Sequence, residues 1–270
     1  MRTQYPGEPT AARPRLRLVL LVSLALLAGC STRVKVIDTD PEFAGRLAAA
    51  DIVALGGVTV APMIGAELAP ADAFAAAEAL FRAFLSGRPD LAAWPAPTVG
   101  EKLGDDVLSV LLAEYGRLGR LRVDQLLPLA EPLHGCRFLA LARLTDDAIR
   151  SQVLDQDGFD PNRPTAEHPR PLTQSVTTER AVTVTLEIFD LASGRSVWQG
   201  EARARERERY RYQDRLQREP SAYLQERLAA ADSPRYLPRQ GEFLQMPDLI
   251  DLLEQALSGL VQRLPEPERR

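Results

Sequence analysis

The sequence predicts an α/β (α+β) protein in which a mixed sheet carries flanking helices. Residues 182–188 alternate strictly between apolar and polar side chains, a polar turn follows, and a second strand-like run returns over 196–202, which is typical of a hairpin. Apolar residues at helical spacing separate the other strand-like runs, and a last amphipathic segment covers 248–264. A chain of 270 residues suffices for one domain with insertions.

The amino-terminal half alternates strand-like and helical segments. Glycine-bounded, β-branched residues predict a strand over 56–63. An Ala-rich helix begins at Pro70, and its apolar residues at helical spacing are Phe74, Ala77, Phe81, Phe84 and Leu85. After a proline-rich connection, Thr98 and Glu101 form a capping-box pattern that begins a second helix. The apolar stripe of that helix is Leu103, Val107, Val110, Leu111 and Tyr115.

The carboxy-terminal half is predicted to be a meander with a polar insertion. A strand is expected over 121–124, a short helix over 125–133 and a buried strand over 137–144. Residues 145–180 are polar and contain several prolines, which predicts a long loop inserted before the hairpin. The second strand of the hairpin covers 196–202.

The amino terminus has the pattern of a cleaved export signal. Several arginines in residues 1–17 precede an apolar run of about a dozen residues, which is shorter than the roughly 20 residues that a spanning helix needs. Leu27, Ala28, Gly29 and Cys30 follow, and this sequence resembles the lipobox of bacterial lipoproteins. The alternative is a plain secretory signal followed by a chance cysteine.

The lipobox resemblance implies how the chain is processed and where it resides. It implies cleavage before Cys30, conversion of that thiol to a diacylglycerol thioether, and further acylation with fatty acids such as palmitate. Ser31, rather than aspartate, follows the cysteine, which implies sorting to the outer membrane. The remaining cysteine, Cys136, lies in an apolar segment and is predicted to be a buried core residue.

Processing at this site divides the chain into expected parts. They are a signal peptide (1–29), a lipidated tether (30–50), a periplasmic α/β domain (51–264) with the 145–180 insertion, and a tail (265–270). Within the tether, residues 34–37 are suited to add a short edge strand.

Three local patterns resemble a known envelope fold. They are the opening strand 58–62, the helix-to-strand unit 111–123 and the hairpin 186–198. Their order is similar to the fold shared by curli-secretion-channel lipoproteins, the amino-terminal domain of the translocation protein TolB and the lipoprotein activators of penicillin-binding proteins. Pore-forming hairpins of the curli family need strands of about ten alternating residues. Neither 145–180 nor 203–218 has that lipid-facing pattern, so a channel subunit is disfavoured.

Composition and motifs favour binding over catalysis. The net charge of −4 provides no global basic field for nucleic acid. Neither a nucleophile elbow, a phosphate loop nor a zinc motif occurs, and His134 and His168 have no partner at ligand spacing. The acidic run 155–162 has the wrong register for a calcium loop. We therefore expect a protein that is not an enzyme and holds no cofactor or metal.

Residues 203–212 are a candidate binding segment. If the hairpin strand continues through them, alternation places five arginines on one face: Arg203, Arg205, Arg207, Arg209 and Arg211. Such a face is suited to lipid head groups, a cell-wall polymer or an acidic partner protein. The alternatives are a solvated edge strand and a helix stabilised by Glu–Arg ion pairs.

Together these features predict an outer-membrane-anchored, periplasm-facing lipoprotein that serves as a non-enzymatic binding or assembly module of the cell envelope. Its expected partners are the membrane, through the lipid on Cys30, and an envelope protein, with no nucleic acid. The main alternative is a lipoprotein activator of a peptidoglycan synthase, and a third is an envelope hydrolase.

Overall fold

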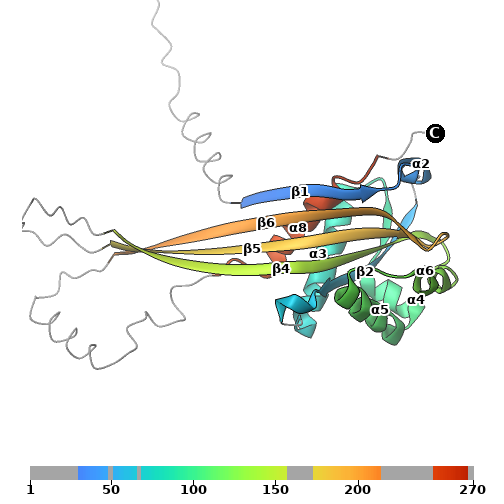
Figure 1. Cartoon of the computed structure of the whole chain (residues 1–270), viewed down its shortest axis with the longest axis horizontal. Coiled ribbons are helices and arrows are strands. Elements are labelled where there is room, and N and C mark those ends of the chain that lie inside the picture. Colours follow the sequence, from blue (N-terminus) through green and yellow to red (C-terminus); the bar gives the residue numbers. More distant parts are fainter. Residues whose placement is uncertain (1–29, 48–50, 66–67, 157–172, 214–245, 267–270) are drawn as a thin grey trace, which may run out of the picture.

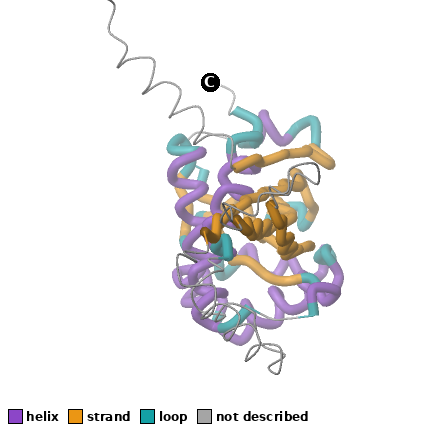
Figure 2. Tube along the Cα trace, turned by 90° about the vertical axis from the view of Figure 1, so that its left-hand side faces the viewer, coloured by secondary structure: helices purple, strands orange, loops and turns teal. Residues whose placement is uncertain are grey.

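Six strands form one mixed sheet in the order β1-β6-β5-β4-β2-β3, with helices on both faces (Figures 1 and 2), which confirms the predicted fold class. The computed structural model describes residues 30–47, 51–65, 68–156, 173–213 and 246–266. The strands are β1 (Cys30–Thr39), β2 (Ile52–Val60), β3 (Ala92–Trp94), β4 (Cys136–Gln156), β5 (Thr173–Asp190) and β6 (Arg195–Gln213). The helices are α2 (Phe43–Arg46), α3 (Pro70–Gly87), α4 (Ala96–Leu103), α5 (Asp105–Leu118), α6 (Val123–Leu126) and α8 (Leu249–Val261), with the short 3-10 helices η1 (Pro62–Ile64) and η2 (Leu127–Ala130).

The sheet has a core on each face. On one face, α3 and α8 pack over the middle strands. On the other, α4, α5 and α6 cover only the part near β2 and β4. The predicted alternation of the hairpin is confirmed, because its apolar residues all enter the α3–α8 core: Val182, Val184, Leu186 and Ile188. The predicted terminal helix is also confirmed, and the Asp248 carboxylate caps it by accepting from the Ile250 N–H at 2.6 Å.

Helix α3 lies where predicted but faces the core with a different side. Its buried residues are mainly small: Ala76, Ala79, Leu80, Ala83 and Phe84. Phe74 and Leu85, which were expected in the apolar face, are 60% and 52% exposed. A row of alanines lets α3 approach α8 and the sheet closely, so the close-packed side is not the one with the largest side chains.

The predicted single helix from Thr98 is wrong in two respects. The helical segment begins at Ala96 and is broken at Gly104, which has a positive φ of 86°, so α4 and α5 are separate helices.

The strand expected over 121–124 is not formed either, because α6 begins at Val123. There the Arg122 N–H donates to the Gln125 side chain at 2.8 Å, which closes a helical turn instead.

The expected loop over 145–180 is largely strand. Strands β4 and β5 continue through its two ends and pair with each other up to residues 156 and 173, and only 157–172 fall outside the described residues. With β6, these strand ends form a three-stranded extension that reaches beyond the helices, here called the arm (149–156, 173–180 and 205–213; Figure 1). Because the helices do not reach over the arm, its strands need no apolar face, and the hydrophobic pattern that signals a strand is missing.

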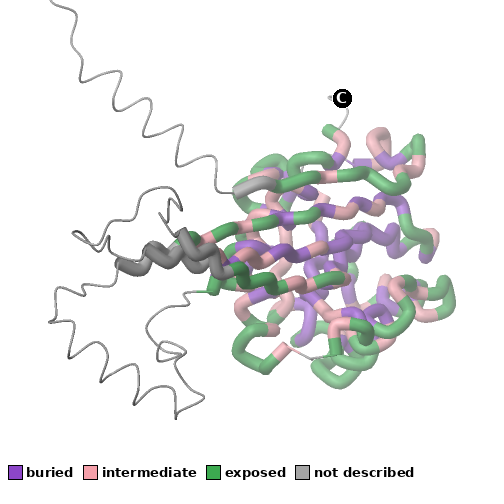
Figure 3. Tube along the Cα trace, turned by 60° about the vertical axis from the view of Figure 1, so that its left-hand side comes forward, coloured by how far each residue is buried: buried purple, intermediate pink, exposed green. Residues whose placement is uncertain are grey.

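The expected tether is not a tether over its first ten residues, because they form β1. This strand pairs antiparallel with β6 from Cys30 opposite Glu206 to Thr39 opposite Trp198. The edge strand expected over 34–37 is therefore confirmed and is longer than expected. Figure 3 shows that β1 is mostly exposed, whereas buried residues concentrate in the inner strands beneath the helices.

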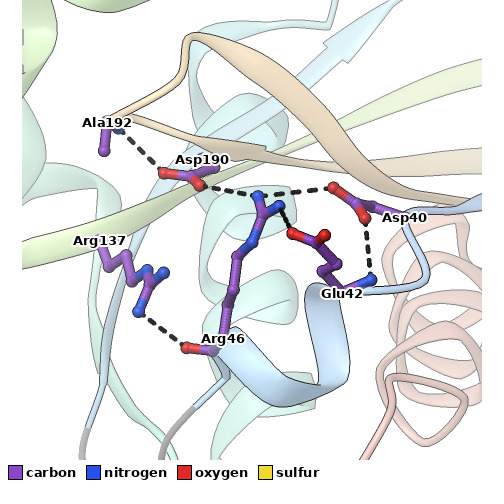
Figure 4. A network of polar contacts seen from close by, with 6 residues as sticks. All are labelled: Asp40, Glu42, Arg46, Arg137, Asp190 and Ala192. Atoms are coloured by element: carbon purple, nitrogen blue, oxygen red, sulfur yellow. Dashed lines mark hydrogen bonds and ion pairs between the residues drawn. The ribbon is translucent and has the colours of Figure 1, made fainter.

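A polar network fixes the carboxy-terminal end of β1 (Figure 4). The Arg46 guanidinium lies 3.5 Å from both the Asp40 and Asp190 carboxylates and contacts that of Glu42. Asp190 is only 3% exposed, and its second oxygen accepts from the Ala192 N–H at 2.9 Å. Because Asp190 ends β5, the network joins the end of β1 to the β5–β6 turn.

Candidate functional site: the arginine face and the Cys30 end of β1

Strand β6 continues through residues 203–212, as the arginine-face hypothesis required. Arg203, Arg205, Arg207 and Arg209 are exposed, while Ala204 between them is buried against the α3–α8 core. This alternation places the arginines on the side of the sheet opposite α3 and α8. The side chain of Arg211 lies outside the described residues, although its backbone continues the strand.

Strand β1 adds two further cations that sequence reasoning missed. Arg33 lies directly opposite Arg203, and Lys35 lies directly opposite Glu201. Directly opposed residues of an antiparallel pair share a face, so the basic surface spans two strands. The members of this surface, here called the arginine face, are Arg33, Lys35, Arg203, Arg205, Arg207 and Arg209. The pairing joins distant parts of the chain, and no local pattern in the sequence reports it.

Glu179 of β5 neutralises part of the arginine face. Its carboxylate accepts from Arg207 Nε and Nη2 at 3.1 and 2.7 Å and lies 3.8 Å from Arg205. The hydrogen bond from Arg207 holds the pKa of Glu179 below its usual range, and the charges of Arg205, Arg207 and Arg150 act in the same direction. One carboxylate therefore pairs with two arginines, so the surface keeps an excess of positive charge.

Arg33 and Arg203 form the least compensated part of this surface. Neither has an ion-pair partner within the part of the chain that the structure describes. Like charges directly opposite each other on a sheet destabilise it by a few tenths of a kcal/mol or more. A bound anion would remove this repulsion, and the planar, bifurcated guanidinium suits phosphate and carboxylate oxygens.

Cys30 begins β1 at the end of the sheet that carries the arginine face. Its register partner is Glu206, between Arg205 and Arg207 in β6, so the register sets Cys30 in line with Glu206 on the α8 side and not with the arginines. The lipobox residues Leu27, Ala28 and Gly29 and the remainder of the signal lie outside the described residues. Cys136 differs from Cys30 because it is buried, and burial raises the pKa of its thiol to about 11. This environment agrees with the predicted packing role of Cys136.

The other candidate groups are not assembled into a site. His134 is exposed, whereas His168 and most of 155–162 lie outside the described residues. Within the described ranges, no group of three His, Cys, Asp or Glu residues is placed to hold a metal ion. In the same ranges, no helix has both the length and the apolar character needed to cross a bilayer.

A buried acid was not foreseen from the sequence. Glu187 belongs to the polar side of the alternating strand β5, yet it is 5% exposed because α5 covers it. Burial raises the pKa of Glu187, an effect opposed by the nearby Ser196 and Tyr115 hydroxyls. Burial, followed by the charge of Glu187, raises the pKa of Tyr115 well above its ordinary value. This pair lies in the interior, apart from the exposed arginine face.

No protein-family model matches the chain, and no curated protein matches its sequence. Similar solved structures include lipoprotein GNA1162 from Neisseria meningitidis, with 14% identity over 67% of this chain and 95% of that one and a TM-score of 0.35. The PelC dodecamer from Paraburkholderia phytofirmans has 14% identity over 88% and 99%, with a TM-score of 0.36. The LpoB C-terminal domain from Salmonella enterica has 10% identity over 64% and 90%, with a TM-score of 0.31. Because these TM-scores are below 0.5, no residue role is transferred from them.

Proposed function

We propose that the protein is a lipid-anchored, non-enzymatic binding or assembly module of the bacterial envelope, held on the periplasmic side of the outer membrane through Cys30. The observation that carries this proposal is the position of Cys30 as the first residue of β1. The lipobox pattern ends at the residue where the sheet begins, so an anchor on Cys30 would be attached to the sheet itself.

This position has a mechanical consequence for a lipid-anchored protein. Acyl chains contribute about 0.8 kcal/mol for each buried methylene, so several chains on one cysteine hold a protein stably at a bilayer. With β1 paired to β6 from Cys30 onward and fixed at its other end by the Arg46 network, the sheet edge would be held next to the membrane. Such an anchor would keep the β1–β6 edge of the sheet close to the bilayer.

The anchor is tested by replacing each cysteine separately. Cys30→Ala should abolish incorporation of labelled palmitate and release the protein from the membrane fraction, because the acceptor thiol is lost. Cys136→Ala is the matched control and should keep the label, since that thiol is buried and its pKa is raised to about 11. Palmitate labelling that persists in Cys30→Ala would contradict the proposal.

The binding role is tested by isolating partners from detergent-solubilised envelope. Recovery of a secretion or assembly complex would support the proposed module. Recovery of a peptidoglycan synthase would instead select the synthase-activator alternative. Turnover of an envelope substrate by the purified protein, with no partner present, would overturn both and favour the hydrolase alternative.

A further inference from the structure

We infer that the arginine face binds the anionic phospholipid surface of the membrane in which the Cys30 lipid would be embedded. This inference rests on the proposed anchor and adds a second membrane contact to it. Three observations carry it: the distance of the arginines from Cys30, the excess of positive charge on the face, and the contrast with the opposite side of the same strands.

The arginine face lies within electrostatic range of the anchor position. Glu206 is the register partner of Cys30, and Arg203 and Arg209 are each three residues from Glu206 along β6. Neighbouring strands lie about 4.8 Å apart and residues advance about 3.3 Å along a strand. The backbones of Arg205 and Arg207 are therefore about 6 Å from that of Cys30, and those of Arg203 and Arg209 are about 11 Å from it. The Debye length at physiological ionic strength is about 8 Å, so a bilayer at Cys30 would act most strongly on Arg205 and Arg207.

Within the described ranges, no helix covers the arginine face. Helices α4 and α5 pack against β2, with α5 also touching β4, and α6 lies beside the β5–β6 turn (Figure 1). Arg33 and Arg203 lie side by side on adjacent strands, and Arg205, Arg207 and Arg209 continue the row along the arm. A row of guanidinium groups on a strand face suits an extended array of phosphate groups, each of which can accept two hydrogen bonds from one arginine.

The opposite side of the same two strands has the reverse charge. A groove of about 630 Å³ lies there between β1, β6 and α8, and its lining includes Glu206, Asp251 and Glu254. Arg82 pairs with Glu254 at 2.7 Å, so Glu206 and Asp251 carry the negative charge of the groove. An anionic surface would repel this groove and attract the arginine face. The charge difference therefore selects which side of the β1–β6 edge turns toward lipid.

The proximity of Cys30 favours lipid over a soluble polyanion or an acidic protein as the occupant. The anchor would keep phosphate head groups beside the face continuously, whereas any other anion would have to displace them. Basic residues near an anionic bilayer each increase binding roughly fivefold. The combined effect of several arginines is therefore large enough to measure without the acyl chains.

Vesicle sedimentation tests the inference on the full chain carrying Cys30→Ser, which has no acylated cysteine. Vesicles of phosphatidylcholine alone are compared with vesicles containing about one third phosphatidylglycerol, a fraction that gives an anionic surface. Replacing Arg33, Arg203 and Arg205 together by Gln should lower binding to the anionic vesicles about tenfold or more. The corresponding Lys replacements should retain most of the binding, because they keep the charge.

A second triple variant provides the charge-matched control. Arg117→Gln, Arg120→Gln and Arg122→Gln change exposed arginines outside β1 and β6 and should leave vesicle binding within about twofold of the parent. All variants share residues 1–29, so any contribution of that segment cancels. Salt at about 0.5 M should abolish the difference between the parent and the first triple variant. Thermal unfolding of each variant separates loss of binding from loss of structure.

The outcomes are distinct. Equal binding to neutral and anionic vesicles, or equal losses in both triple variants, would overturn the inference. Binding of the same variants to soluble polyphosphate is measured in parallel. If the first triple variant keeps its vesicle binding but loses its polyphosphate binding, the arginine face binds a polymer instead of lipid. Palmitate labelling reports on the anchor independently, so the proposed function survives if labelling occurs at Cys30 and only the vesicle test fails.

Discussion

The buried carboxyl of Glu187 should make the protein less stable at neutral than at acidic pH, and Glu187→Gln should remove that difference. Glu187 is 5% exposed, and one of its oxygens has no hydrogen-bond partner among the described residues. The groups that oppose the effect of burial on the pKa of Glu187 are the neutral Ser196 and Tyr115 hydroxyls and not a cation. An ionised Glu187 is therefore a desolvated charge in the interior.

The sign of the pH dependence follows from the raised pKa of Glu187 in the folded state. The pKa of this carboxyl in the unfolded chain is about 4.5, the ordinary value for glutamate, so below that pH it is protonated in both states and its burial does not lower the free energy of unfolding through ionisation. As pH rises through the raised folded-state pKa, ionisation opposes folding. Glutamine has the same shape and remains neutral. The free energy of unfolding of the variant should therefore be about 1–3 kcal/mol higher at pH 8, which is the usual cost of an uncompensated buried polar group.

Thermal unfolding at pH 4 and pH 8 measures this prediction. For a chain of this size, each kcal/mol corresponds to about 2–4 °C in Tm. Glu187→Gln should raise Tm at pH 8 and leave it nearly unchanged at pH 4, relative to the parent protein. Glu131→Gln, at an exposed position, is the control and should change Tm little at either pH. A variant that is less stable than the parent at pH 8, or equally shifted at both pH values, would refute the reasoning.

The remaining predictions concern the Arg46 network and the break between α4 and α5. Arg46→Met should lower the free energy of unfolding in denaturant titrations, because it leaves the buried Asp190 carboxylate without its cation. The double variant with Asp190→Asn should recover part of that loss. If Arg46→Met alone has no effect, the network does not hold β1 in place. Gly104→Ala should lower the free energy of unfolding by about 1–2 kcal/mol, because a φ of 86° strains any residue with a Cβ. A neutral or stabilising result would show that α4 and α5 form one continuous helix.

The parts of the fold that were predicted are those in which local pattern and burial coincide. The hairpin of β5 and β6 was predicted because its alternating residues enter a core, and α8 because its apolar stripe is flanked by Asp248 and Pro265. The arm was missed because none of the described helices covers it, so its strands carry polar residues on both faces and resemble a loop in sequence.

The candidate surface was also predicted only in part. Alternation alone placed Arg203, Arg205, Arg207 and Arg209 on one face once the strand was assumed to continue. The contribution of Arg33 required the pairing of β1 with β6, which no local pattern encodes. The burial of Glu187 similarly depends on the position of α5 over the sheet.

The pairing of β1 with β6 also sets the order in which the sheet can be completed. The first strand of the described chain takes its place beside the last one, so this edge can close only after all six strands have emerged during synthesis or export. Contacts between such distant segments form slowly, because a long loop must close before any of them is made. Until then the outer edge of β6 is exposed and can pair with other chains. The interval between emergence of β6 and docking of β1 is therefore the step at which this protein is most vulnerable to misassembly.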